Sequence, residues 1–117
     1  MTERFARTPE PPYYAVIFTN QLSKEDAGYA EMGDRMYALA LEQPGCLGAE
    51  STRDTANFGI TVSYWDSEDS IRAWKANAKH LVAQTLGLER WYSHFELRVA
   101  KVERAYAGPE GRSLPQS

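Results

Sequence analysis

The feature of the sequence that most restricts the fold is a change of period in the middle of the chain. In "FGITVSYW", residues 58–65, apolar side chains stand at every second position. In "DSEDSIRAWKANAKHLVA", residues 66–83, they return three or four positions apart. The first pattern predicts a strand, and the second predicts an amphipathic helix. The chain is therefore expected to pass directly from a strand into a helix that Asp66 or Ser67 caps.

Two stretches before this junction predict a strand and a helix. "YYAVIFTN" (13–20) is aromatic and β-branched and holds no breaker, so it predicts a first strand. Ser23 and Asp26 then offer an N-cap and a carboxylate three residues on, which predicts that a helix starts there. Pro44 and Gly45 are expected to end it. The expected apolar face of this helix consists of Tyr29, Met32, Met36, Leu39 and Ala40.

Two more strands complete the pattern. "CLGAESTRD" (46–54) is joined to the strand at 58–65 by the short polar connection "TAN", so the pair predicts a β-hairpin. "FELRVAKVERAY" (95–106) predicts the last strand. The resulting order, β-α-β-β-α-β, predicts an α+β, ferredoxin-like fold in which both helices cover one face of an antiparallel sheet.

The first strand also predicts how the other face of the sheet is covered. Its side chains are apolar on both sides, whereas a sheet with helices on one side only is expected to carry polar side chains on its free face. The chain offers no spare element for a second apolar face. Two sheets are therefore expected to pack face to face in a homodimer, as a dimeric α+β barrel. The two sets are Tyr13, Ala15 and Ile17 on one side and Tyr14, Val16 and Phe18 on the other.

Length and composition limit the chain to one folded domain. A chain of 117 residues, 43% of them hydrophobic, suffices for a single core. The domain is expected to span 13–106. Residues 1–12 are charged and rich in proline, and residues 107–117 are rich in Gly, Pro and Ser, so both are expected to be flexible segments.

Charge and cysteine content exclude several classes of protein. The net charge of −3 and the scattered basic residues argue against nucleic acid as a partner. Cys46 is the only cysteine, which excludes an internal disulfide and a cysteine-based zinc cluster. The sequence has no signal-peptide pattern and no stretch near the roughly 20 apolar residues of a membrane span. A soluble, cytoplasmic protein without a membrane partner is expected.

Aromatic side chains give the main sign of a ligand site. Trp65 and Trp74 stand on either side of the change of period, and the space between sheet and helices can hold a flat organic ligand, although core packing also accounts for both residues. His80 lies about 120° around the helix from Trp74, which favours a surface or interface position over a role as ligand. His80 and His94 lack the spacing of a metal site, so no metal is expected.

Several motifs together resemble one family. "EQPGCLGAES" ends a helix at Pro-Gly, and "FGITVSYWDSEDSIRAWKANAKH" closes a strand on Tyr-Trp before a helix with Ala-Trp-Lys and a later His. This pattern resembles the antibiotic-biosynthesis-monooxygenase (ABM) superfamily, in particular its branch of small proteins related to haem-degrading monooxygenases. The resemblance covers nearly all of 13–106 and implies a dimeric α+β barrel. The matching residues are Pro44, Gly45, Gly48, Tyr64, Trp65, Ala73, Trp74, Lys75 and His80.

The resemblance also implies a set of site residues. In the characterised haem degraders an Asn on the first strand, a Trp on the second helix and a His further along that helix act together. Asn20, Trp74 and His80 take these places and are the expected catalytic residues, although His80 follows Trp74 by six positions, closer than the family's haem-ligand spacing. The expected substrate-binding residues are Trp65, Phe18 and Tyr64.

The function that the resemblance implies is that of a small monooxygenase acting on a flat aromatic or haem-like substrate between sheet and helices. No cofactor is expected to be required, and haem is the alternative substrate. The competing hypothesis is a non-catalytic ligand-binding or interaction module whose functional unit is the dimer. A cavity of ligand size favours the oxygenase, and a core packed shut by the aromatic residues favours the module.

The expected homodimer can be tested in solution. Sedimentation or light scattering at micromolar protein concentration should give twice the mass of the 117-residue chain, because the second apolar face needs a cover. The mass of a single chain under these conditions would contradict the expectation.

Overall fold

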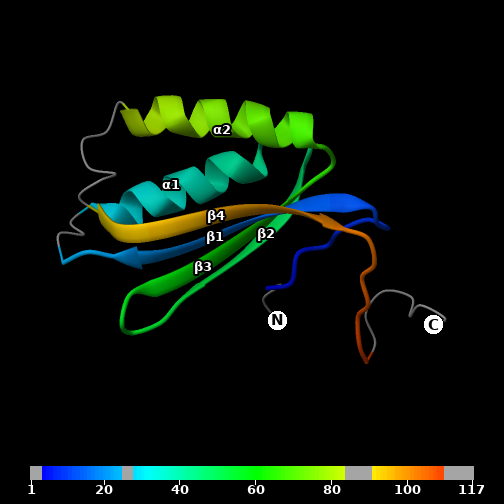
Figure 1. Ribbon diagram of the computed structural model, residues 1–117, viewed down its shortest axis with the longest axis horizontal. Helices are drawn as coiled ribbons and strands as arrows, with labels where there is room; N and C mark the ends of the chain where they lie inside the picture. The colour runs from blue at the N-terminus through cyan, green and yellow to red at the C-terminus, as the bar shows by residue number, and fades with distance from the viewer. Residues whose placement is uncertain (1–3, 25–27, 84–90, 110–117) are drawn as a thin grey trace.

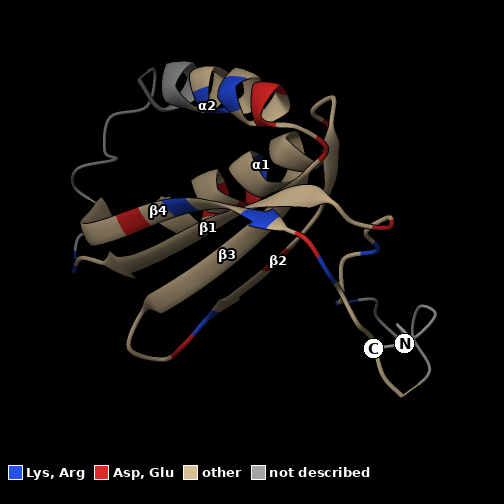
Figure 2. Cartoon of the chain, turned by 45° about the vertical axis from the view of Figure 1, so that its right-hand side comes forward, with Lys and Arg blue, Asp and Glu red and all other residues tan. Residues whose placement is uncertain are grey.

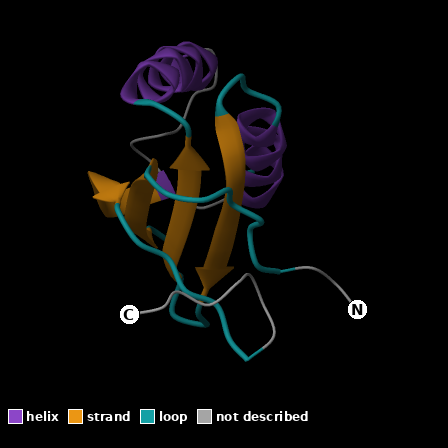
Figure 3. Cartoon of the chain, turned by 90° about the vertical axis from the view of Figure 1, so that its right-hand side faces the viewer, coloured by secondary structure: helices purple, strands orange, loops and turns teal. Residues whose placement is uncertain are grey.

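The computed structural model describes residues 4–24, 28–83 and 91–109 of the chain, and of residues 79–83 only the backbone. The strands form one antiparallel sheet in the order β2-β3-β1-β4, and both helices lie on the same side of it (Figure 1 and Figure 3). The predicted ferredoxin-like α+β fold is confirmed. The elements are β1 (Tyr13–Leu22), α1 (Tyr29–Leu41), β2 (Cys46–Arg53), β3 (Phe58–Trp65), α2 (Glu68–Ala83) and β4 (Tyr92–Val102).

The first helix begins later than predicted. α1 starts at Tyr29 behind Gly28, which has a left-handed backbone and forms no side-chain cap. Ser23 is not the N-cap, because β1 continues to Leu22 and the Ser23 N–H donates a hydrogen bond to the carbonyl of Trp91. Asp26 lies outside the described residues. Ser23, where the capping pattern predicted the start of a helix, therefore continues the hydrogen bonding along β1 instead.

The last strand also lies earlier in the chain than predicted. β4 covers Tyr92–Val102 rather than 95–106, because it pairs with the whole length of β1, from Tyr13 opposite Val102 to Leu22 opposite Tyr92. Tyr92, which precedes the predicted start, thus belongs to the edge strand of the sheet.

The register of the sheet assigns each side chain of β1 to one of two faces. We call the face that the helices cover the helix face and the opposite one the outer face. The core lies on the helix face, where the fully buried Trp65 packs with Val16 and Ile71. On β1 the helix face comprises Tyr14, Val16, Phe18, Asn20 and Leu22, and the outer face comprises Tyr13, Ala15, Ile17, Thr19 and Gln21.

The β2–β3 hairpin forms where the polar connection predicts it. The Asp54 Oδ1 atom accepts hydrogen bonds of 2.9 Å from two backbone N–H groups of the turn. Asn57 has a φ of 68°, which asparagine adopts more readily than most residues. This turn sets the register of the hairpin, so Arg53 lies directly opposite Gly59.

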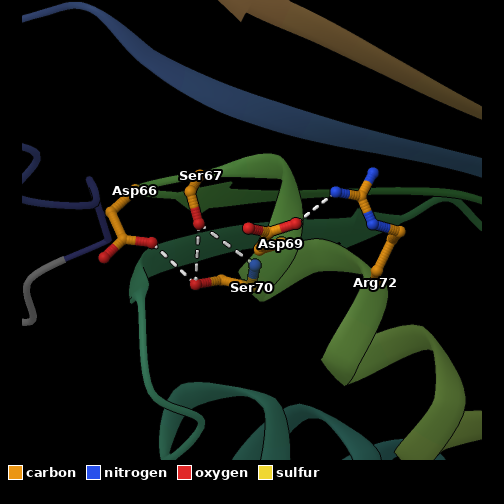
Figure 4. A network of polar contacts seen from close by, with 5 residues as sticks. All are labelled: Asp66, Ser67, Asp69, Ser70 and Arg72. Carbon is orange, nitrogen blue, oxygen red and sulfur yellow. Dashed lines mark hydrogen bonds and ion pairs between the residues drawn. The ribbon is translucent and has the colours of Figure 1, made fainter.

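A polar network fixes the start of α2 (Figure 4). Ser67 is the cap, one of the two predicted positions, and its Oγ accepts a hydrogen bond of 3.1 Å from the Ser70 N–H. The Ser70 hydroxyl donates to the Asp66 carboxylate at 2.7 Å, and the Asp66 N–H donates to the Gly45 carbonyl at 2.9 Å. Gly45 has a φ of 88°, and a methyl group there would overlap Ser70 and Asp66. The turn after α1 therefore docks directly on the cap of α2.

Part of the outer face is covered by the N-terminal segment of the same chain. The Ala6 N–H donates to the Glu50 carboxylate at 2.9 Å, and the hydroxyls of Thr8 and Tyr13 share a hydrogen bond of 2.9 Å. The expectation that the chain has no element left for this face is therefore wrong for the end of the sheet near Tyr13, which is 4% exposed. Residues 4–12 cover this end of the outer face through polar contacts. Their low apolar content gave no indication that they would do so.

The two central strands are free of charge. β1 and β3 contain no Lys, Arg, Asp or Glu, and Figure 2 shows the charged positions on the helices, the two edge strands and the β2–β3 hairpin. Toward the hairpin the outer face exposes Phe58 and Ile60, so an apolar surface remains there. Within the described part of the chain, neither helix is long and apolar enough to cross a membrane.

Replacement of Gly45 by Ala should destabilise the protein. The left-handed backbone disfavours any residue with a Cβ, and the added methyl group overlaps the groups that cap α2. We expect the free energy of unfolding, measured by urea denaturation, to fall by about 2–3 kcal/mol.

Gly33→Ala is the matched control. Gly33 lies inside α1, and a methyl group there would make only ordinary contact with the Tyr29 ring. This change should stabilise the protein by about 0.5–1 kcal/mol. If both variants lost stability equally, Gly45 would have no special role in docking the cap.

Candidate functional site

One end of the helix face carries a pair of stacked tryptophans. The rings of Trp65 and Trp74 have centroids 6.4 Å apart and planes 19° apart. Trp65 is fully buried, and its indole N–H donates to the Ser63 Oγ at 2.8 Å. Trp74, from α2, is half-buried. Trp65 is therefore a core residue, and Trp74 forms the more accessible layer of the stack.

At the other end of the helix face a cation reaches across the sheet. Arg53 of β2, Gly59 of β3 and Asn20 of β1 lie in one row. Because Gly59 has no side chain, the Arg53 guanidinium lies over its backbone, where a Cβ would come within 2.5 Å of the Arg53 Cζ. Arg53 Nη2 thereby donates to the Oδ1 of Asn20 at 2.7 Å. The glycine thus allows an edge-strand arginine to contact the strand beyond its neighbour.

This hydrogen bond fixes the orientation of the Asn20 amide. A guanidinium can only donate, so the amide oxygen must face Arg53 and the NH₂ group must face away. Asn20 is 2% exposed. Within the described residues its NH₂ group donates no hydrogen bond. Asn20 therefore offers hydrogen-bond donors and no acceptor.

Tyr29, at the start of α1, completes the group. Its hydroxyl oxygen accepts hydrogen bonds from Arg53 Nη2 at 3.0 Å and from the Tyr92 hydroxyl at 3.3 Å. The guanidinium carbon also lies 5.1 Å from the centroid of the Tyr29 ring, within the range of a cation–π contact. We call Asn20, Tyr29, Arg53 and Tyr92 the Arg53 cluster.

The two hydroxyls of the cluster act as donors. Burial, followed by the hydrogen bond to Tyr29, raises the pKa of Tyr92, so this hydroxyl stays protonated and donates to Tyr29. Because the Tyr29 oxygen already accepts two hydrogen bonds, its own proton remains available for an acceptor in open space. The Arg53 cluster thus presents positive charge and hydrogen-bond donors.

Aromatic rings and an open pocket adjoin the cluster. Phe18, Tyr92 and Phe95 pack edge to face at centroid distances of 5.5–5.7 Å. A pocket of about 560 Å³ lies where α1 begins, and Arg53 and Tyr29 both line it. Its other lining residues are Leu22, Gly28, Ala30, Glu31 and Asn57. The arrangement can accept a flat ligand with a hydrogen-bonding or anionic edge.

The structure separates the predicted site residues. Asn20 and Phe18 lie at the end of the helix face that holds the Arg53 cluster, whereas Trp65 and Trp74 lie at the other end. Along β3, Trp65 stands six positions from Gly59, which pairs with Asn20. Six positions of a strand correspond to about 20 Å. A ligand that touches both ends must therefore extend along most of the sheet.

Tyr64 lies on the outer face, apart from the other predicted residues. Its hydroxyl donates to the Glu50 carboxylate at 2.7 Å. Its ring packs edge to face against Tyr13, with 5.8 Å between centroids. Tyr64 therefore does not face the space between the sheet and the helices.

The predicted roles of His80 stay predictions. His80 belongs to α2, but its side chain lies outside the described residues.

Cys46 packs against the Trp65 core, and burial raises the pKa of its thiol, which favours the protonated, packing role over a nucleophilic one. In the described ranges no three His, Cys, Asp or Glu side chains gather to hold a metal ion.

The sequence alone does not identify three members of the cluster, namely Tyr29, Arg53 and Tyr92. Arg53 does carry a signal, because closing the hairpin at "TAN" pairs it with a glycine over which a long side chain can lie. Tyr29 reads as one member of an apolar helix stripe. Tyr92 precedes the predicted last strand. Only their contacts across the fold reveal their part in the cluster.

Comparison with known proteins gives a family match. Residues 14–86, from β1 to beyond the end of α2, match the family model described as antibiotic biosynthesis monooxygenase. The chain is also 50% identical over 104 residues to the uncharacterized protein YqjZ of Bacillus subtilis (strain 168), a match that covers 89% of this chain and 91% of that protein.

Solved structures share the fold at low sequence identity. SnoaB, a cofactor-independent oxygenase from Streptomyces nogalater, matches with a TM-score of 0.67 at 16% identity, over 81% of this chain and 97% of that one. A putative antibiotic biosynthesis monooxygenase from Nitrosomonas europaea matches with a TM-score of 0.63 at 9% identity, over 82% and 94%. PA3566 from Pseudomonas aeruginosa gives 0.63 at 15% identity, over 83% and 98%.

The contact of Arg53 across Gly59 can be tested with a double-mutant cycle. Gly59→Ala should push the guanidinium away from Asn20 and Tyr29 and cost about 1–2 kcal/mol of unfolding free energy. In an Arg53→Ala background the same change should cost almost nothing, because no side chain then lies over residue 59. Urea denaturation of the four proteins gives a coupling energy of about 1 kcal/mol or more. Additive effects would show that Arg53 does not depend on Gly59.

Proposed function

The chain belongs to the antibiotic biosynthesis monooxygenase family, and on this premise we propose that it is a cofactor-independent oxygenase of a flat, acidic aromatic substrate. The substrate binds on the helix face of the sheet, beside the Arg53 cluster. SnoaB, which shares the fold, is a cofactor-independent oxygenase, and this supports the reaction class. The substrate itself and O₂ are the two reactants.

The observation that carries the proposal is the orientation of the Asn20 amide. Arg53 holds the amide oxygen, so the NH₂ group is the part of Asn20 that a ligand can meet. Donors fixed in advance stabilise negative charge that develops on oxygen during a reaction, and one such donor is typically worth about 10²–10³ in rate. The family resemblance assigns Asn20 to catalysis, and its geometry is that of a donor to bound oxygen or substrate.

The proposed reaction balances without a cofactor. A base takes the proton from an acidic ring carbon, and the carbanion passes one electron to O₂. The radical pair then combines to a peroxide anion, which takes a proton back, and loss of water from the hydroperoxide leaves a carbonyl group. Every electron that reduces O₂ comes from the substrate. Asn20 and the Arg53 cluster stabilise the charged oxygens, and we propose His80 as the base.

The proposal assigns Trp74 to the wall of the substrate site. Its ring is backed by the buried Trp65 and is itself half-buried, so it is held in place, and a flat substrate that reaches this end of the sheet can stack on it. We propose that a homodimer is the functional unit. The exposed Phe58 and Ile60 on the outer face support a contact with a second copy near the hairpin.

Asn20→Asp tests the proposed role directly. The carboxylate keeps an acceptor for Arg53 but removes the NH₂ donor, so oxygenation should fall by about a hundredfold while the unfolding temperature is preserved. The probe is anthrone in air-saturated, chelator-treated buffer. Oxygen uptake is followed together with the formation of anthraquinone, one O₂ giving one quinone and one water. With a substrate long enough to reach the Trp65 end of the sheet, Trp74→Phe should likewise lower turnover far more than stability.

Gln21→Glu is the matched control, because it makes the same amide-to-acid change at the next residue, on the outer face. It should leave the rate of anthrone oxidation unchanged. A wild-type protein that does not accelerate anthrone oxidation, or an Asn20→Asp protein as active as the wild type, would contradict the proposed function and favour a binding module.

A further inference from the structure

We propose that the pocket beside the Arg53 cluster is an anion-recognition site, which binds the carboxylate or phenolate oxygen of an aromatic ligand. This inference rests on the proposed function, because the ligand is taken to be the substrate of the oxygenase. It adds that the substrate carries a negative charge. Binding can be measured without turnover, so the two proposals can fail separately.

The charge of Arg53 is not neutralised by any described residue. Its hydrogen bonds go to neutral oxygens: Asn20 Oδ1 at 2.7 Å, Tyr29 Oη at 3.0 Å and the Asn57 carbonyl at 2.8 Å. The ion pairs found in the described ranges involve other cations. A guanidinium carries five N–H donors, so two of them have no acceptor there. A half-buried positive charge whose partners are all neutral is stabilised when an anion binds beside it.

Other residues that line the same pocket also carry hydrogen-bond donors. Tyr29 lines it and retains a hydroxyl proton after accepting two hydrogen bonds. The first turn of α1 also lines it, and that helix starts at Gly28 without a side-chain cap. The first N–H groups of a helix have no partner within it and carry the positive end of its dipole. A positive charge, a hydroxyl group and backbone N–H donors therefore belong to residues that surround one space.

The pocket is built for an aromatic body behind the anion. Leu22, 7% exposed, lines it, and the Tyr29 ring packs edge to face against Trp91 with 5.8 Å between centroids. Gly28 lies beside the Trp91 ring, where a Cβ would stand 3.8 Å from it. Leu22 and the Tyr29 ring thus give apolar walls next to the donors, and Trp91 supports the Tyr29 ring. Such walls favour an aromatic acid over a small, fully hydrated anion.

The negative charge of Glu31 should have the opposite effect on anion binding to the positive charge of Arg53. Glu31 is an exposed residue in the first turn of α1, and it lines the same pocket. Its carboxylate repels an anionic ligand, although solvent weakens the repulsion. Removal of the negative charge at 31 should therefore strengthen anion binding, whereas removal of the positive charge at 53 should weaken it.

The experiment compares naphthalene-2-carboxylate with naphthalene-2-carboxamide, its neutral counterpart, by isothermal titration calorimetry. The carboxylate should bind about tenfold more tightly than the amide. Arg53→Gln should abolish this difference, Arg53→Lys should keep part of it, and Glu31→Gln should enlarge it. 2,4-Dinitro-1-naphthol, ionised at neutral pH, tests whether a phenolate serves as well as a carboxylate. Arg72→Gln, on the exposed side of α2, is the control and should change nothing.

Unfolding temperatures of all variants separate loss of binding from loss of fold. Equal affinity for carboxylate and amide, or an Arg53→Gln protein that keeps the full preference, would overturn the anion site even if anthrone is oxidised. A preference for the carboxylate that follows residues 53 and 31 as stated, in a protein without oxygenase activity, would leave the anion site standing and remove only the proposed function.

Discussion

The antiparallel pairing of β1 with β3 is the constraint on which the other features of the molecule depend. Because alternate residues of a strand face opposite sides, the pairing of Tyr14 with Trp65 also sets Asn20 opposite Gly59. A slip by one residue would bring either the polar Asn20 to the outer face or Trp65 out of the core. The same register therefore places the packed tryptophans at one end of the helix face and the Arg53 cluster at the other.

One end of the helix face is a packed core, and the other end carries a polar cluster. Trp65 is fully buried and Trp74 stacks on it, so this end is mostly a core that supplies a firm aromatic wall. At the other end, the missing side chain of Gly59 lets Arg53 lie flat against the sheet and orient Asn20. A stable core and a polar cluster are thus separated along one surface, which suits a long, flat ligand that is stacked at one end and hydrogen-bonded at the other.

The sequence predicts the fold well and the site only in part. The change of period at Trp65 and the polar turn before Phe58 depend on local patterns, and the structure has both. Ser23 looks like a helix cap in sequence, but pairing with β4 overrides it. Tyr64 looks like a neighbour of Trp65, but strand alternation sends it to the other face. The Arg53 cluster joins β1, β2, β4 and α1, and contacts of this kind are not encoded in the spacing of any one segment.

A titration of ¹⁵N-labelled protein with naphthalene-2-carboxylate, followed by NMR, shows where on the sheet an aromatic anion binds. We expect the largest chemical-shift changes at the side-chain NH₂ of Asn20, at the guanidinium N–H of Arg53 and at the backbone N–H groups that begin α1. Changes confined to the outer face, around Ile17 and Val62, would contradict this expectation, because the ligand would then bind on the side of the sheet away from both helices.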